Sequence, residues 1–246
     1  MDLKEETAIG GDPSNHWYYI SKGRAIKSLL GDAAFDSVLD VGAGSGVFSR
    51  MLIDAGICQH AICVDPNYAD DWIENNQSPQ IQYLRRVGDS VAPLVVMLDV
   101  IEHVDDDVAL IRQYAQSAKP GTKFLISVPA FEFLWSSHDD FLEHRRRYTL
   151  ATLESTVRSA GLEPLQQRYF FGLLFPAAAA LRIADRAMKG DRQATSSALR
   201  SAPDWLNALL VRAHDAERAA LFPLNQWFGM TAFCLAEVAG EETIAA

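Results

Sequence analysis

The chain has 246 residues, of which 49% are hydrophobic and 22% charged, as in a globular protein with an ordinary core. Its net charge of −10 disfavours a nucleic-acid partner, because binding a phosphate backbone needs a basic surface. The three cysteines fit reduced core thiols, and the acidic first residues lack the apolar stretch of a secretion signal. We therefore expect a cytoplasmic protein, a monomer or homodimer, with one elaborated α/β domain.

The predicted elements alternate between strands and helices. A polar start over residues 1–15 leads into a helix through Leu30, and a last strand is expected at 231–238. Such alternation predicts a doubly wound, mostly parallel sheet with helices on both faces, and ligands that bind beyond the carboxyl ends of its strands. Further strands are expected at 37–41, 60–65, 80–84, 94–99, 122–128 and 164–171, and helices from near Gly46, Tyr68, Asp105 and Thr149.

A glycine-rich loop follows the first predicted strand. Gly42, Gly44 and Gly46 recur at every second position, and a helix-like segment begins at Val47. Glycine allows a sharp turn or close contact with a ligand, and the helix N-terminus presents free N–H groups to the same loop. This pattern predicts a nucleotide site. The dinucleotide fingerprint needs its third glycine where Val47 stands, so an NAD-dependent oxidoreductase is disfavoured.

Acidic residues end two later strands of the predicted sheet. Asp65 lies about 20 residues past the glycine loop, where a carboxylate can accept hydrogen bonds from both hydroxyls of a ribose. Asp99 ends the apolar run 94–98 and begins the sequence Asp99-Val-Ile-Glu-His103. A Lys-Pro-Gly turn then precedes the strand at 122–128. These spacings strengthen the prediction of a nucleoside site at one edge of the sheet.

Together these segments resemble the class I S-adenosylmethionine-dependent methyltransferases. Residues 38–46 match the family's first motif, residues 99–103 its D-V-L-E-H form, and residues 118–122 its L-K-P-G-G segment. The resemblance implies a seven-stranded sheet, and S-adenosylmethionine as cofactor with S-adenosylhomocysteine as product. We expect no metal, because no Cys/His cluster of the sequence has zinc-ligand spacing. The resemblance assigns cofactor binding to Asp40, Gly42, Ala43, Gly44, Gly46, Asp65, Asp89, Asp99 and Tyr19.

The polar segment 135–149 follows the fifth predicted strand, and it resembles the W-S-x-H-D…H-x-R-R-Y-T signature of a bacterial methyltransferase type 11/12-like subgroup. Histidine can accept a proton near neutral pH, and arginine pairs with anionic groups. The same side chains could instead form surface salt bridges and a helix cap at Thr149. We expect His144, His138, His103 and Tyr148 to be catalytic, with the first three ordered as proton acceptors, and Arg146, Arg147, Asp139 and Trp135 to bind substrate.

About 58 residues separate the last two predicted strands, too many for a hairpin loop, so they form a helical insertion. Residues 170–181 are apolar and are followed by basic residues, which fits either a lid helix or a peripheral contact of residues 170–192 with the inner face of a membrane. We expect four parts: a cap segment and helix (1–36), the cofactor-binding core (37–172), the insertion or lid (173–229), and the last strand with a tail (230–246).

The resemblance implies methyl transfer to a small-molecule, sugar or lipid-linked acceptor, with O- or C-methylation favoured. A soluble metabolite and an amphiphile both remain open as acceptors, and the apolar start of the insertion favours the amphiphile. Two alternatives are a non-catalytic or regulatory protein that binds the cofactor, and, more remotely, an NAD-dependent oxidoreductase.

Overall fold

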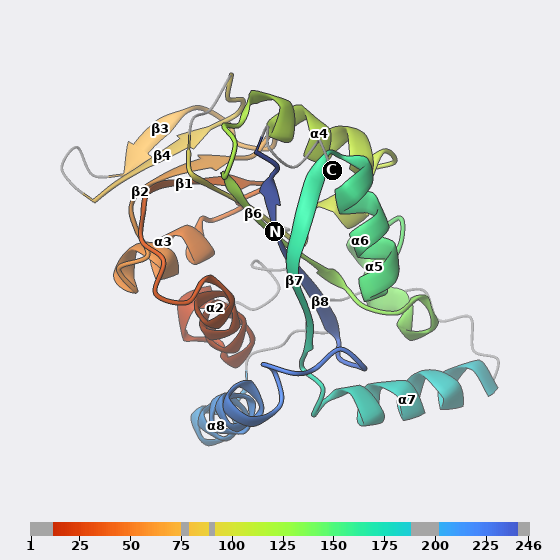
Figure 1. The fold of residues 1–246 in the computed structure, drawn as a ribbon. Coiled ribbons are helices and arrows are strands. Elements are labelled where there is room, and N and C mark those ends of the chain that lie inside the picture. Colours follow the sequence, from red (N-terminus) through yellow and green to blue (C-terminus); the bar gives the residue numbers. More distant parts are fainter. Residues whose placement is uncertain (1–11, 75–78, 89–91, 188–201, 241–246) are drawn as a thin grey trace.

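The computed structural model describes residues 12–74, 79–88, 92–187 and 202–240. Its centre is one eight-stranded sheet in the order β3-β4-β2-β1-β5-β6-β8-β7 (Figure 1). The five neighbouring strands β4, β2, β1, β5 and β6 run parallel, whereas β8 is antiparallel to both β6 and β7. The strands are β1 Phe35–Val41, β2 Cys58–Val64, β3 Trp72–Glu74, β4 Gln80–Leu84, β5 Leu94–Leu98, β6 Lys123–Pro129, β7 Leu162–Phe170 and β8 Thr231–Val238.

The α/β class is confirmed, but the expected count of seven strands is wrong because β3 adds an eighth at the edge. The helix expected to begin near Tyr68 is also wrong, since Trp72–Glu74 pairs antiparallel with β4. The cause is an aromatic cluster: the Trp72 ring stacks on Tyr83 with centroids 4.3 Å apart, and Tyr68 packs edge-on against both rings. Aromatic pairs across neighbouring strands stabilise such an edge strand.

Helices cover both faces of the sheet (Figure 1). On one face α2 and α3 pack over a core that includes Tyr19, Phe48 and Val38. On the other face α4 and α6 pack over Leu39 and Ile111. The neighbouring β1 residues Val38 and Leu39 thus pack on opposite faces of the sheet, as the two-residue period of a strand requires. The helices are α2 Trp17–Leu30, α3 Val47–Asp54, α4 Asp107–Ser117, α5 Ser137–Phe141, α6 Leu150–Ser159, α7 Phe175–Ala187 and α8 Asp204–Ala220, with short helices η1 Pro13–Asn15, η2 Ile101–His103 and η3 Glu132–Leu134.

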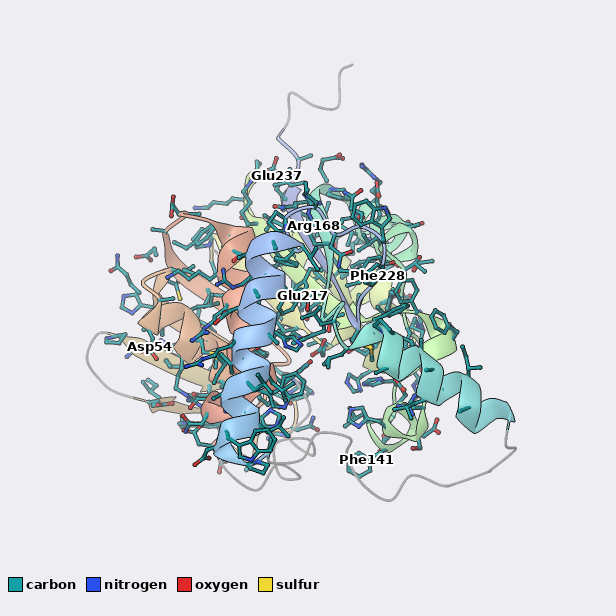
Figure 2. The ribbon with its side chains drawn as sticks, turned by 90° about the horizontal axis from the view of Figure 1, so that it is seen from below. Asp54, Phe141, Arg168, Glu217, Phe228 and Glu237 are labelled. Atoms are coloured by element: carbon teal, nitrogen blue, oxygen red, sulfur yellow. The ribbon has the colours of Figure 1, made fainter. Side chains whose placement is uncertain are left out.

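Two of these helices, α7 and α8, lie in the insertion between β7 and β8, and they are separate in space (Figure 2). The Phe175 ring of α7 lies 5.4 Å from that of Phe131 and 5.9 Å from that of Phe133, next to η3. Helix α8 packs along α2, where Arg24 and Asp215 form an ion pair. Among the described helices, none is both long and apolar enough to cross a membrane.

The insertion is tied to the sheet at both of its ends. Buried Glu217 on α8 accepts hydrogen bonds from the backbone N–H groups of Gly172 (2.6 Å) and Leu173 (3.3 Å), just before α7. After α8, the N–H of Met230 donates to Phe170 O at 2.9 Å, so the returning chain lies against the end of β7. This close approach needs glycine at position 229, because a Cβ there would lie 2.3 Å from Phe170 O.

We predict that Gly229→Ala lowers the free energy of unfolding by about 1–3 kcal/mol, because backbone must shift to admit the added methyl group. Urea denaturation measures the change. Gly240→Ala is the matched control, since a Cβ at Gly240 meets nothing within 4 Å. Equal stability of the two variants would contradict the close packing of β7 against the returning chain.

Candidate active site

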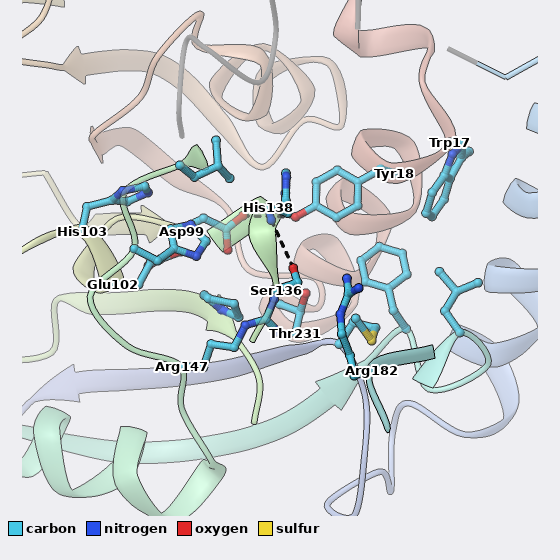
Figure 3. A pocket seen from close by; sticks show the side chains of 16 residues that line it. Trp17, Tyr18, Asp99, Glu102, His103, Ser136, His138, Arg147, Arg182 and Thr231 are labelled. Carbon is cyan, nitrogen blue, oxygen red and sulfur yellow. Dashed lines mark hydrogen bonds between the residues drawn. The ribbon is translucent and has the colours of Figure 1, made fainter. Parts of the chain in front are cut away.

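A cavity of about 220 Å³ opens at the carboxyl ends of β5 and β6 (Figure 3). Glu102 and His103 lie at one side of it, whereas Trp17 and Arg182 lie at the other side (Figure 3). Trp17 is joined in the lining by Phe171, Leu174 and Met230. The cavity is thus an apolar chamber with an ionisable end, formed by α2, the loops after β5 and β6, and the start of the insertion.

The polar end collects three of the expected catalytic residues. His103 follows β5, while His138 and His144 come from the segment after β6, and all three line the cavity. The His103 and His144 rings lie 4.8 Å apart and nearly perpendicular. The backbone N–H of Arg145 donates to Glu102 O at 2.7 Å, so the two loops are joined directly beside these rings.

Asp139 is fully buried and holds this polar end together. Its carboxylate accepts two hydrogen bonds from Arg147, at 2.7 and 3.0 Å, and one from His144 Nδ1 at 2.9 Å. The backbone N–H of Ser136 also donates to it, at 2.8 Å. Burial by itself would raise the pKa of Asp139, but the hydrogen bonds from His144 and Arg147 outweigh it and hold the pKa well below its usual range. Asp139 therefore orients the His144 ring through Nδ1, and Nε2 is the ring nitrogen that Asp139 does not bind.

Asp139, which was expected to bind substrate, does not line the cavity, and three further expected site residues also make their contacts outside the lining. Arg146 donates to the carbonyl oxygens of Val104 and Asp105, at 3.2 and 2.7 Å. The buried Tyr148 hydroxyl donates to the Asp107 carboxylate at 2.8 Å. Trp135 Nε1 donates to Asp140 at 2.9 Å. Arg146 and Tyr148 therefore fasten the segment after β6 to the loop after β5.

Asp99 lies at the end of β5 and lines the cavity. It forms an ion pair with the fully buried Lys22, and it accepts hydrogen bonds from the Tyr18 hydroxyl (3.1 Å) and Ser127 Oγ (3.2 Å). Burial would raise the pKa of Asp99, but the adjacent Lys22 ammonium keeps it below its ordinary value. Glu102 is also buried, and burial together with the charge of Asp99 raises its pKa well above the usual value.

The glycine loop is placed at the same edge of the sheet, beside Asp65 rather than in the cavity lining. Gly44 N donates to the Asp65 carboxylate at 3.2 Å, and Gly42 has a φ of 68°, in the left-handed region that favours glycine. The N–H groups of Gly42 and Ala43 donate to Val64 O. The structure thus groups the residues predicted to hold the nucleoside around the ends of β1 and β2.

The other expected cofactor residues differ in their placement. Asp40 faces α3, where it accepts from Ser49 Oγ at 2.7 Å, and burial raises its pKa to about 6. Gly46 begins α3, with a φ of 74°. Tyr19 is fully buried against Phe48 in the core. Asp89 lies outside the described residues.

Sequence reasoning missed Tyr18 and Lys22, which approach Asp99 from α2. The two residues are four positions apart and so share one face of a helix, while Tyr19 lies on another. That spacing was the available signal. Glu102 was part of a recognised motif but received no role, and Arg182 was counted only as one of the insertion's basic residues.

A family model described as a methyltransferase domain matches residues 16–167. No curated protein matches the sequence. One similar structure is a chain of the complex between the Haloferax volcanii Trm112 methyltransferase activator and a methyltransferase, with 18% identity, a TM-score of 0.55, and coverage of 92% of this chain and 91% of that one. A SAM-dependent methyltransferase from Archaeoglobus fulgidus has 15% identity and a TM-score of 0.51, with coverage of 89% of this chain and 93% of that one. The [4+2]-cyclase SpnF has 13% identity and a TM-score of 0.53, with coverage of 89% of this chain and 80% of that one.

We predict that Asp139→Asn lowers the free energy of unfolding at pH 7 by about 3–5 kcal/mol, because it leaves the Arg147 charge unpaired. The folded-state pKa of Asp139 is depressed, so its stabilisation is complete above the unfolded pKa of about 3.9 and is lost as pH falls through the folded pKa. The difference in the free energy of unfolding between wild type and variant should therefore shrink below about pH 4.

Denaturant titrations from pH 3 to pH 7 measure this gap. Asp140→Asn is the matched control, since Asp140 is the exposed neighbour on the same short helix, and its substitution should change stability by less than about 1 kcal/mol. A gap that stays constant with pH would contradict the role given to Asp139.

Proposed function

The chain belongs to the methyltransferase domain family and is an S-adenosylmethionine-dependent methyltransferase, and we propose that it methylates an oxygen or carbon atom of a small amphiphilic acceptor. The single observation that carries this proposal is the cavity beside Asp99, which three histidines line and whose other wall is apolar apart from Arg182. Such a chamber fits an acceptor with an apolar body and one ionisable group.

The described residues at the ends of β1 and β2 fit a bound nucleoside. The Asp65 carboxylate, next to Gly44 N, would accept hydrogen bonds from the ribose hydroxyls, and the glycines allow the backbone close to the cofactor. Asp99 and Tyr18 would form the boundary between the methionine end of the cofactor and the cavity. When bound, S-adenosylmethionine supplies a methyl group already activated on a sulfonium.

The protein has to align the acceptor, exclude water and accept a proton where the acceptor carries one. His144 is our first candidate for the proton acceptor, because its Nδ1 is held by Asp139 while the residue lines the cavity. His138 and His103 line the same cavity and follow it in order. Asp139 and Arg147 would act by fixing the His144 ring, and Arg182 adds a second cation beside the chamber for an anionic acceptor group.

An amphiphilic acceptor is favoured over a sugar by the apolar surface around the insertion. Trp17, Phe171 and Leu174 line the cavity. Outside it, Leu181 and Ile183 on α7 are 62% and 65% exposed, and Trp227 after α8 is 72% exposed. Exposed apolar side chains beside a cavity favour a peripheral contact with a membrane or with a lipid-linked substrate. In this proposal α7 acts as the lid through which the acceptor enters.

We predict that Asp65→Asn weakens S-adenosylmethionine binding about 10- to 100-fold, because hydrogen bonds to a charged group contribute about 1.5–3 kcal/mol. Isothermal titration calorimetry measures the affinity, and thermal melting shows whether the variant folds. Asp36→Asn, an exposed acid at the opposite end of β1, should bind as wild type does. Equal affinities of the two variants would remove Asp65 from the cofactor site.

Transfer itself is tested with methyl-labelled S-adenosylmethionine and cell extract divided into aqueous and lipid fractions. We expect label in the lipid fraction, and we expect His144→Ala to reduce it about 100-fold or more, the usual effect of losing a general base. His60→Ala, at a histidine on β2 away from the cavity, should retain full transfer. Label only in the aqueous fraction would overturn the proposal of an amphiphilic acceptor. Cofactor binding without any labelled product would favour a non-catalytic protein.

A further inference from the structure

Three potential metal ligands meet at the polar end of the cavity. One ligand atom each from Glu102, His103 and His144 can be chosen so that all three lie within 4.8 Å of one another. Figure 3 shows Glu102 and His103 side by side at this end of the cavity, and His144 belongs to the same lining. Glu102 and His103 come from η2 after β5, whereas His144 follows α5, so the cluster exists only in the folded chain.

Glu102 is the residue that points to a missing partner. Its side chain is fully buried, and neither carboxyl oxygen is hydrogen-bonded to another described residue. A buried carboxyl group without a partner residue is costly whether it is ionised or protonated, and native proteins rarely leave one unsatisfied. The ammonium of Lys22 is already paired with the neighbouring Asp99. A cation bound by Glu102 would satisfy these oxygens.

His144 has the arrangement of a histidine prepared for a metal. Its Nδ1 is hydrogen-bonded to the buried Asp139 carboxylate at 2.9 Å, which leaves Nε2 as the ligand atom. A carboxylate that holds the far nitrogen of a histidine ligand fixes the ring and raises its basicity. Arg147 anchors Asp139 in turn with two hydrogen bonds.

The loops that carry the ligands are fixed to each other before any ion arrives. Arg145 N donates to Glu102 O at 2.7 Å, and the Arg146 guanidinium donates to Asp105 O at 2.7 Å. The Tyr148 hydroxyl lies 3.4 Å from Ile101 O. These contacts hold the backbone of η2 and of the loop that follows it in place. Ligand atoms bound to a tetrahedral ion at about 2.0–2.2 Å lie roughly 3.3–3.6 Å apart. The present spacing of up to 4.8 Å would therefore have to shorten when an ion binds.

We propose that Glu102, His103 and His144 bind one divalent transition-metal cation of the Zn²⁺ type. Two imidazoles and one carboxylate favour such an ion over Mg²⁺, Ca²⁺ and Mn²⁺, which prefer oxygen ligands. Three protein ligands leave coordination positions open toward the cavity, where an acceptor oxygen can bind and lose its proton more readily. In the metal-loaded protein His144 is then a ligand, and His138 is the remaining histidine of the cavity that can accept a proton.

This inference goes beyond methyl transfer, and it differs from the sequence expectation of no metal. That expectation rested on the absence of a Cys/His cluster with zinc spacing, and the fold brings together residues about 40 positions apart, as loops at one sheet edge can. Because the test measures metal binding without cofactor or acceptor, its failure would leave the proposed methyl transfer standing.

The experiment titrates tag-free, EDTA-treated and dialysed protein with Zn²⁺ by calorimetry, with Mg²⁺ and Mn²⁺ for comparison. We expect one equivalent of Zn²⁺ to bind, and Mg²⁺ and Mn²⁺ to bind far more weakly. Glu102→Gln, which keeps the side-chain volume, and His103→Asn should each weaken binding by at least about 100-fold, since loss of an outer-shell partner alone costs about 10- to 100-fold. Thermal melting confirms that both variants fold.

His138→Asn is the matched control, because it removes a histidine of the same cavity that is outside the proposed ligand set. Its affinity for the ion should equal that of wild type. Cobalt substitution adds a second readout, since the visible absorption of bound Co²⁺ should be lost in Glu102→Gln. Absence of stoichiometric binding, or equal affinities of Glu102→Gln and wild type, would overturn the metal site.

Discussion

The buried Asp139 carboxylate is the interaction on which the candidate site depends. A fully buried charge is tolerated only when it is paired and its oxygens are satisfied, and Asp139 achieves both through Arg147, His144 and Ser136. These partners belong to a segment with little regular structure of its own. The carboxylate therefore serves as its local core, and it fixes the direction of the His144 ring.

The sheet topology explains why the remaining groups meet there. The loops after β5 and β6 leave adjacent parallel strands at the same edge, and α2 approaches that edge through the Lys22–Asp99 ion pair. Two residues of the cavity lining, Asp99 and Phe171, have positive φ values of 54° and 60°. Such strained backbone collects at functional sites, where surrounding contacts hold it in place.

The sequence predicted those features that depend on local pattern. Strand positions, the glycine loop and Asp65 follow from short-range spacing, so the fold class and the meeting of the glycine loop with Asp65 could be foreseen. Strand β3 could not be foreseen, because it forms through the stacking of Trp72 on Tyr83. The local pattern of neither segment reveals this contact. Strand β3 replaced an expected helix.

The site was predictable as a cluster but not residue by residue. His138, His144 and Arg147 do reach the cavity, whereas the adjacent Arg146 and Tyr148 turn to the loop after β5. In an irregular segment no periodicity tells which neighbours face inward, so only the folded structure separates them. In α2 the helical period would have separated Tyr18 from Tyr19, yet the phase of the helix depends on which face meets the sheet.

In the proposed site the cofactor's sulfur lies between the glycine loop and the cavity beside Asp99. A crystal structure with S-adenosylhomocysteine would show where the sulfur lies. We expect the ribose on Asp65 and the sulfur next to Asp99, open to the chamber that His138 and His144 line. A sulfur that faces away from this chamber, or a ligand bound elsewhere, would contradict the account, because the acceptor could not then reach the methyl group from the cavity.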